Sequence, residues 1–328
     1  MNSQNSDDFD KSKDLETNSF SYQWPHIVYA ILFILVTPVY ILILGCVLTM
    51  RRNTVIFRTT FYTILIQHSI ADVLSLASFM FQKITYILAP NFLFNYQQYK
   101  IASVYYNSFY WSFNIRCYGI ALMTIHRYLA IAKPTSRVTQ VVNLNKEPLK
   151  LVTLIYWLPS VVFSAIYFSY PDIGFDSAEK LILVMDADVI SKTKIIFIYV
   201  LSSSVVCLIA YCLIARFIRA KSHSVTKSFQ REVRLAFQVS LAFCAQVVLL
   251  IYLSCTYVFS VMKKVRRNLE FHVLSFQTDQ IVNTRVFFPL VYGFLSYIGP
   301  ITILIFNQDI SKRIKEKLFG KNTVIYRI

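Results

Sequence analysis

Residues 235–262 read LAFQVSLAFCAQVVLLIYLSCTYVFSVM, a run without a single charged side chain. An α-helix needs about 20 mostly apolar residues to cross the hydrocarbon core of a bilayer, which is about 30 Å thick. Each backbone amide of such a segment must find its hydrogen-bond partner inside the segment, because lipid offers none. This run therefore predicts a membrane-spanning helix.

Six further runs of similar length predict further spans. The seven predicted spans are Ile27–Met50, Thr59–Gln82, Ile101–Ile125, Leu151–Pro171, Ile195–Ala215, Leu235–Met262 and Val286–Phe306. The second and third hold one charged residue each, Asp72 and Arg116. Of the 328 residues, 56% are hydrophobic and 15% are charged, whereas a soluble domain carries about 25% charge. The sequence thus predicts an all-α membrane protein whose core is a seven-transmembrane helix bundle.

Basic residues indicate which ends of the spans face the cytoplasm, because Lys and Arg near span ends are held on that side. They gather between the first and second spans, between the third and fourth, between the fifth and sixth, and after the seventh. This distribution predicts that the N-terminus is outside and the C-terminus is inside. The basic cluster within residues 263–267 lies on the other side. It is either a solvated loop start that escapes the orientation rule or an outer patch that attracts acidic ligands.

The chain is predicted to have three regions. They are an extracellular tail at 1–26, the seven-transmembrane domain at 27–306, and a cytoplasmic segment at 307–328. Within the last region, Ile310, Ile314 and Leu318 recur at intervals of four among basic residues. This spacing predicts a short amphipathic helix over Gln308–Leu318, with its apolar edge in lipid at the inner membrane surface.

The sequence contains no motif that indicates an enzyme. It has no HExxH or CxxC pattern, no P-loop, no GxSxG elbow and no glycine-rich dinucleotide fingerprint. We therefore expect no catalytic residues, no metal site and no cofactor. The net charge of +16 is explained by an inner face next to anionic membrane lipid, so a nucleic-acid partner is not needed.

Residues 120–140, IALMTIHRYLAIAKPTSRVTQ, close the third predicted span at its inner end. An arginine between His126 and Tyr128, followed by Pro134, resembles the rhodopsin-like G-protein-coupled receptors, whose usual triplet is Asp-Arg-Tyr. Asp72 midway along the second span, within SIADVLSL, supports the resemblance. The HRYLAIAKPTSRVTQ run and the Phe- and Tyr-rich, glycine-poor composition are most similar to the nematode chemosensory serpentine receptors. Within them, the chain resembles the Srg superfamily and in particular its Srv class, over about residues 27–320.

The resemblance implies a G-protein-coupled chemosensory receptor, a multi-pass protein of the plasma membrane or of a sensory cilium. Such a receptor binds a small, largely apolar external ligand in the outer half of the bundle and activates a heterotrimeric G protein at the inner face. The alternative is a small multi-spanning solute transporter or a ligand-gated channel subunit. That class predicts duplicated halves or polar residues at several depths, and the sequence favours the receptor.

Two departures from the receptor pattern concern the helices that move on activation. The run 235–262 has no proline, so the usual cause of a kink is missing. Gly299 and Pro300 begin a GPITI sequence where the resemblance leads us to expect Asn-Pro-x-x-Tyr. We therefore expect an activation geometry that differs from the usual one.

Arg127 is the residue that the resemblance marks as the conformational switch. His126 and Tyr128 flank it at the inner end of the third span, and the usual acidic neighbour is absent. The lock that holds the resting state must then come from elsewhere, and Glu232 at the start of the sixth span is the nearest acidic candidate. We expect these four residues to govern G-protein coupling.

Asp72 and Arg116 are charges inside the membrane, where each is costly unless it finds a partner or water. A helical rise of 1.5 Å per residue places both about 16–20 Å above the inner surface. The matching acid of rhodopsin-like receptors helps to hold sodium, and we expect Arg116 to take the place of that cation in a buried ion pair. The alternative is that Arg116 pairs with backbone carbonyls and Asp72 with water.

Aromatic residues with hydroxyl or indole groups are the candidates for ligand binding. They are Tyr106, Tyr110 and Trp111 on the third span, Tyr252 and Tyr257 on the sixth, and Tyr292 on the seventh. Aromatic walls with a few donors suit a small, largely apolar molecule. The alternative is that these side chains contact lipid or form the interfacial belt.

Overall fold

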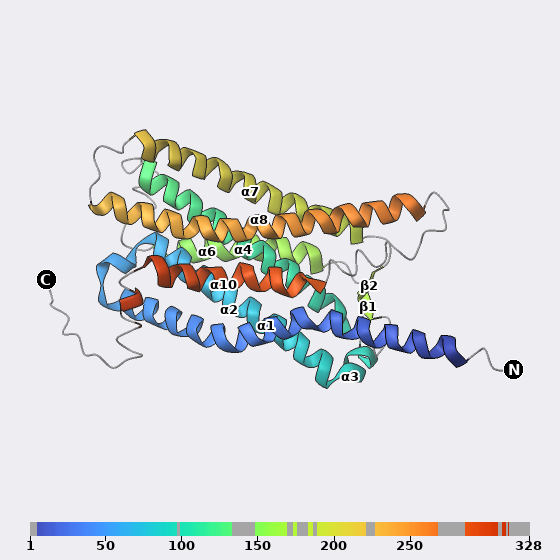
Figure 1. Cartoon of the computed structure of the whole chain (residues 1–328). Coiled ribbons are helices and arrows are strands. Elements are labelled where there is room, and N and C mark those ends of the chain that lie inside the picture. The colour runs from blue at the N-terminus through green and yellow to red at the C-terminus, as the bar shows by residue number, and fades with distance from the viewer. Residues whose placement is uncertain are drawn as a thin grey trace.

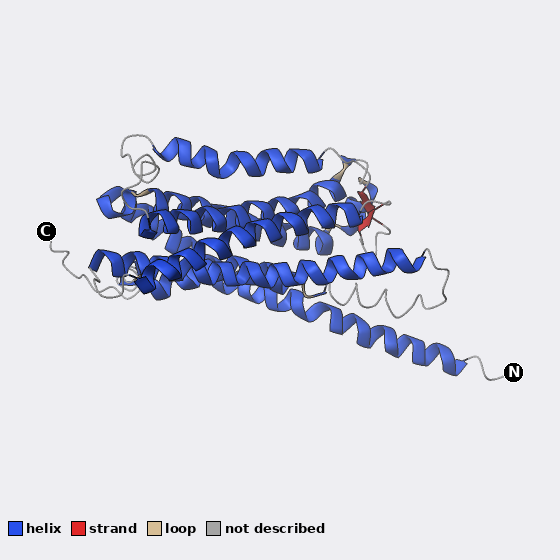
Figure 2. Cartoon of the chain, turned by 90° about the horizontal axis from the view of Figure 1, so that it is seen from above, coloured by secondary structure: helices blue, strands red, loops and turns tan. Residues whose placement is uncertain are grey.

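The computed structural model is a bundle of long helices that lie roughly parallel or antiparallel to one another (Figures 1 and 2). The structure describes residues 5–96, 99–132, 148–168, 173–175, 183–185, 189–220, 227–267, 286–307, 310–312 and 314. The long helices of these ranges are α1 (Asn5–Asn53), α2 (Thr60–Leu88), α4 (Ile101–Ala132), α6 (Pro148–Phe168), α7 (Val189–Ala220), α8 (Lys227–Arg267) and α10 (Phe288–Phe306). Each predicted span coincides for most of its length with one of these helices, and most of the helices extend beyond the predicted span at one or both ends.

Five of these helices are long and apolar enough to cross a membrane. The qualifying stretches are Trp24–Asn53, Thr60–Leu88, Lys194–Ala220, Phe229–Phe259 and Phe288–Phe306. The apolar stretch of α6, Lys150–Ile166, is shorter, and α4 is 32 residues long but carries Arg116 and many hydroxyl groups. The polar character of α4 has a physical reason, because this helix touches α2, α6, α7 and α8 and therefore faces protein on most sides.

The helix that holds the first predicted span extends well beyond it at the N-terminal end. α1 is helical from Asn5 and continues through Pro25 and Pro38, so most of the segment 1–26 is helical as well. At the same end of the bundle, Figure 1 shows the strands β1 (Ile173–Phe175) and β2 (Leu183–Met185). They pair antiparallel, with Gly174 opposite Val184, and they add a short hairpin to a chain predicted to be all-α.

Short helical turns connect the first three long helices. The 3-10 turn η1 (Val55–Arg58) joins α1 to α2, and α3 (Pro90–Asn95) follows α2. Pro90 stands at the start of α3. Proline lacks a backbone N–H, but the first N–H groups of a helix have no acceptor within the helix, so no hydrogen bond is lost at this position.

A glycine lets α4 approach its neighbours closely. A Cβ on Gly119 would lie 2.5 Å from Nδ1 of His68 on α2 and 2.7 Å from the hydroxyl of Tyr156 on α6. Real Cβ atoms do not approach other atoms this closely, so a larger residue at position 119 requires the side chains of His68 and Tyr156, or their helices, to shift. Trp157 adds to the same junction, since its indole donates to Oε1 of Gln67 over 2.8 Å.

The segment after α10 packs against the bundle rather than against lipid. Ile310 and Ile314 are buried in the main core cluster, with exposed fractions of 0% and 5%. This corrects the prediction that the apolar edge of an amphipathic helix faces the membrane, because protein covers that edge at both positions. Leu318 lies outside the described residues.

Candidate functional site

Two opposite charges lie side by side in the middle of the bundle. Asp72 on α2 and Arg116 on α4 are both fully buried, and Oδ1 of Asp72 lies 4.0 Å from Nε of Arg116. This distance is close enough for Coulomb attraction but too long for a hydrogen bond. Oδ1 of Asp72 and Nη2 of Arg116 have no hydrogen-bond partner among the described residues.

Arg116 is held mainly by helix α10. Its Nη1 donates to the hydroxyl of Ser296 and, over 3.4 Å, to the carbonyl of Tyr292. Its Nε donates to the carbonyl of Ser112 over 3.1 Å, and its guanidinium carbon lies 4.2 Å from the ring centre of Tyr292. A guanidinium over an aromatic face is stabilised by the ring quadrupole. The structure thus combines elements of both sequence expectations, with a nearby carboxylate and with backbone carbonyls as acceptors.

Asp72 has partners that the sequence analysis missed. The hydroxyl of Tyr40 on α1 donates to Oδ2 of Asp72 over 2.8 Å. Nε2 of His68, one helical turn before Asp72, lies 3.8 Å from the same oxygen. The spacing of four residues between the histidine and the acid could have identified His68, but nothing in the sequence indicated that Tyr40 faces this point.

A second charged contact lies near the C-terminal end of α4. Nη1 of Arg127 donates to Oε2 of Glu232, which lies near the start of α8. Arg127 is buried, with 2% of its side chain exposed, whereas Glu232 is 31% exposed. The guanidinium carbon of Arg127 also lies 3.4 Å from the ring centre of Phe61 on α2. The side chain of Arg127 therefore links α4 to α8 and to α2.

The neighbours of Arg127 do not share its contact with Glu232. The ring of His126 lies 6.0 Å from that of Phe61. Tyr128 packs against a small apolar cluster that links α4 to α7 and α8. Of the four residues predicted to govern coupling, the structure thus brings Arg127 and Glu232 into direct contact, and Phe61 is an addition that the sequence did not indicate.

The predicted ligand-binding aromatics do not converge on one point. Tyr106 and Tyr110 share a hydrogen bond of 2.5 Å between their hydroxyls. Trp111 lies beside Trp157 at 6.2 Å between ring centres, and the ring of Tyr257 stacks on that of Phe197. These residues occupy different places along α4, α6, α7 and α8.

Tyr252 and Tyr292 meet in an aromatic cluster that the sequence did not predict. Phe288 lies at its centre, 6.1 Å from Tyr252 and 5.6 Å from Tyr292 between ring centres. Phe79 and Phe109 complete contacts from α2 and α4. The hydroxyl of Tyr292 is satisfied, since it donates to the carbonyl of Ser75 over 3.0 Å and lies 2.8 Å from the hydroxyl of Ser112. The cluster therefore offers an apolar wall directly beside Arg116.

The described residues contain no group of three or more His, Cys, Asp or Glu side chains that could hold a metal ion. The chemistry of the arrangement is electrostatic: two buried arginines on one helix, each held by contacts to other helices. Such contacts can be made and broken by helix movement.

Comparison with known proteins assigns the family. No curated protein matches the chain. The family model described as serpentine type 7TM GPCR chemoreceptor Srv matches residues 29–320, which is most of the chain. The apolar helices and this match make the protein a multi-pass membrane protein of a chemoreceptor family rather than a member of an enzyme family. The chain belongs to the Srv family of serpentine seven-transmembrane chemoreceptors.

Proposed function

We propose that this chain is a G-protein-coupled chemosensory receptor of the plasma membrane or of a sensory cilium. It binds a small, largely apolar external ligand in the outer half of the bundle and activates a heterotrimeric G protein at the inner face. The observation that carries the proposal is the contact of buried Arg127 with Glu232, which ties α4 to the start of α8.

In this proposal all seven long helices cross the membrane, including α4 and α6. The support for α4 is its position among α2, α6, α7 and α8, because a helix enclosed by others needs no apolar outer surface. The basic residues near the C-terminal ends of α1, α7 and α10 support a cytoplasmic position for those ends. The N-terminal segment 1–26 is then outside, the bundle covers 27–306, and the segment 307–328 is cytoplasmic.

The Arg127–Glu232 contact serves as the resting-state lock. A hydrogen bond to a charged group contributes about 1.5–3 kcal/mol, which is comparable to the few kcal/mol that separate two states of a switching protein. Breaking the contact frees the start of α8 to move away from α4. This movement exposes Arg127, which can then contact the G protein together with His126 and Tyr128.

The aromatic cluster around Phe288 is the proposed wall of the ligand site. It includes Tyr252 and Tyr292, and the hydroxyl of Tyr292 is already bonded within the bundle. Such a wall suits a ligand that gains affinity from contact area. The secondary candidates, for contacts nearer the outer ends of the helices, are Tyr106, Tyr110, Trp111 and Tyr257.

The decisive experiment is the Arg127→Ala variant, with surface level and guanine-nucleotide exchange on G proteins measured in the same membranes. Glu232 is partly exposed and can be hydrated when its partner is lost, so we expect a normal surface level and no stimulated exchange. Arg52→Ala removes an exposed arginine at the end of α1 and is the matched control, which should retain exchange. Retained exchange in Arg127→Ala at a normal surface level would overturn the proposal. A ligand-gated current without any G protein would favour the channel class instead.

A further inference from the structure

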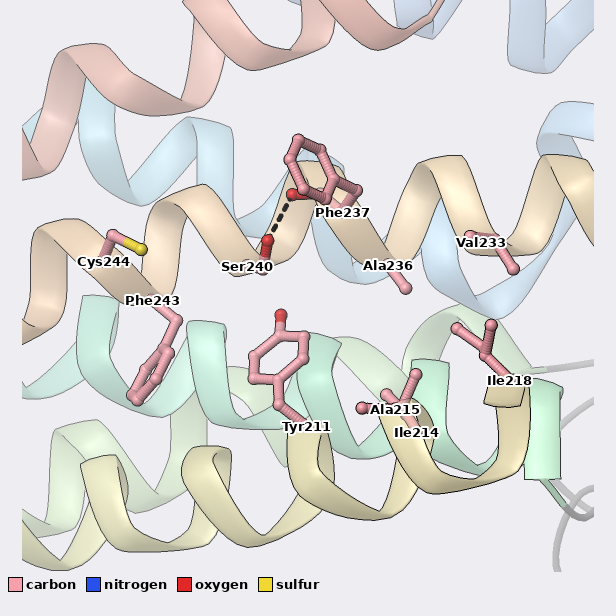
Figure 3. Close-up of a pocket in the computed structure, with 10 residues that line it drawn as sticks. All are labelled: Tyr211, Ile214, Ala215, Ile218, Val233, Ala236, Phe237, Ser240, Phe243 and Cys244. Carbon is pink, nitrogen blue, oxygen red and sulfur yellow. Dashed lines mark hydrogen bonds between the residues drawn. The ribbon is translucent and has the colours of Figure 1, made fainter. Parts of the chain in front are cut away.

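An open groove of about 340 Å³ runs between α7 and α8 (Figure 3). Its walls are almost entirely apolar. The hydroxyl of Ser240 donates to the carbonyl of Phe237 over 2.7 Å, so this serine makes its hydrogen bond within its own helix. The groove therefore suits a hydrocarbon rather than a polar ligand.

The groove opens away from the centre of the bundle. Its floor includes Ile214 and Ala236, which are buried against Ile131 of α4. Its edges include Ala215 and Phe237, which are exposed. In a multi-pass membrane protein a groove with a buried floor and exposed apolar edges faces lipid.

Two exposed arginines stand at one end of the groove. Arg219 follows Ala215 by four residues on α7, and Arg234 precedes Phe237 by three residues on α8, so each lies on the same helical face as an edge residue. Both are exposed, and neither forms an ion pair with an acid in the part of the chain that the structure describes. Two exposed cations that have no acidic partner among the described residues, beside an apolar groove, match the phosphate and acyl chain of one lipid molecule.

We propose that this groove binds an anionic phospholipid, with a segment of one acyl chain between α7 and α8 and the phosphate between Arg219 and Arg234. A volume of about 340 Å³ is at the low end for small-molecule sites, so it accommodates part of a single chain and leaves the rest in the bilayer. The inference uses the orientation given under the proposed function, in which this end of α7 and α8 meets the inner leaflet, where anionic lipids are concentrated.

The position of the lipid gives it a regulatory role. Arg234 lies two residues after Glu232, which contacts Arg127. A phosphate that bridges Arg219 and Arg234 holds the end of α7 to the start of α8. The bound lipid therefore restrains the helix whose movement releases Arg127.

The test is native mass spectrometry of the full-length protein with added phosphatidylserine or phosphatidylcholine, which needs neither a G protein nor a chemosensory ligand. We expect tighter binding of phosphatidylserine. Each basic residue near an anionic surface contributes about fivefold in affinity, so Arg219→Gln with Arg234→Gln should weaken binding about 25-fold. Arg52→Gln on α1 is the control and should have no such effect.

Filling the groove tests the acyl-chain half of the proposal. Ala215→Trp places an indole at the edge of the groove and should weaken phosphatidylserine binding, whereas Val206→Trp at another exposed position of α7 should not. Equal binding of the two lipids, or full competition by chain-free glycerophosphoserine, would overturn the proposal. Loss of self-association in Ala215→Trp with unchanged lipid binding would also overturn it and identify the groove as a contact between two copies of the chain.

Discussion

The buried Asp72 and Arg116 should be energetically coupled, and a double-mutant cycle can measure the coupling. At the observed 4.0 Å, two unit charges attract by about 4 kcal/mol at an effective dielectric constant of 20. Because no hydrogen bond joins them directly, we expect a coupling free energy below this value, about 1–3 kcal/mol. The single variants Asp72→Asn and Arg116→Gln should each reduce the free energy of unfolding, since removal of one partner of a buried pair costs about 3–5 kcal/mol.

The two single variants should differ in severity. Asp72→Asn leaves Arg116 with Ser296, two backbone carbonyls and an aromatic face, so its cost should be at the low end. Arg116→Gln leaves Asp72 with Tyr40 as its hydrogen-bond donor among the described residues, so its cost should be at the high end. The double variant should cost clearly less than the sum, because it leaves no unpaired buried charge.

The assay is unfolding of the purified full-length protein in lipid nanodiscs, with surface level in cells as a second readout. Gln246→Leu combined with Asp72→Asn is the control cycle, because Gln246 bonds to Ser203 and Ser204 in a separate network. That pair should be additive within about 0.5 kcal/mol. If the costs of Asp72→Asn and Arg116→Gln add equally well in the double variant, the pairing is refuted, and each charge is stabilised by its other neighbours alone.

Two further substitutions test the packing and the lock. Gly119→Ala places a methyl group 2.5 Å from Nδ1 of His68 and should reduce the free energy of unfolding by about 1–3 kcal/mol. The control is Gly45→Ala, which has open space around its Cβ and should not reduce it. Equal unfolding free energies of the two variants would contradict the close approach at Gly119. Glu232→Gln removes the charge that holds Arg127 and should raise ligand-independent nucleotide exchange about tenfold, the equivalent of about 1.4 kcal/mol. Unchanged basal exchange at a matched surface level would show that this contact does not hold the resting state.

The positions of the helices could be predicted from the sequence because uncharged runs of this length have few other solutions. The same helical rise also gave Asp72 and Arg116 equal depth, since both residues lie on long helices whose inner ends can be located. The partners of those charges were harder to predict. Tyr40 and Ser296 reach them only because α1 and α10 present a particular face to the centre, and that rotation depends on packing between helices.

The C-terminal segment shows a related limit. The spacing of Ile310 and Ile314 correctly identifies an apolar edge. It does not say what covers that edge, because lipid tails and the apolar side chains of other helices are equally apolar. The structure buries both residues against the bundle. The groove between α7 and α8 was missed for the same reason, since side chains such as Ala215 and Phe237 fit a lipid-facing surface whether or not it is hollow.

The two buried arginines of α4 link its contacts to different helices. Arg116 and Arg127 are 11 residues apart, which is about 16 Å along the axis and about three turns, so their side chains leave nearly the same face of the helix. Arg116 is bonded to Ser296 of α10, and Arg127 is bonded to Glu232 of α8. Since a helix moves as a rigid element, an axial shift of 1–2 Å, typical of switching helices, changes both contacts together. A ligand that displaces Tyr292, whose carbonyl accepts from Arg116, therefore acts on the same helix that carries Arg127.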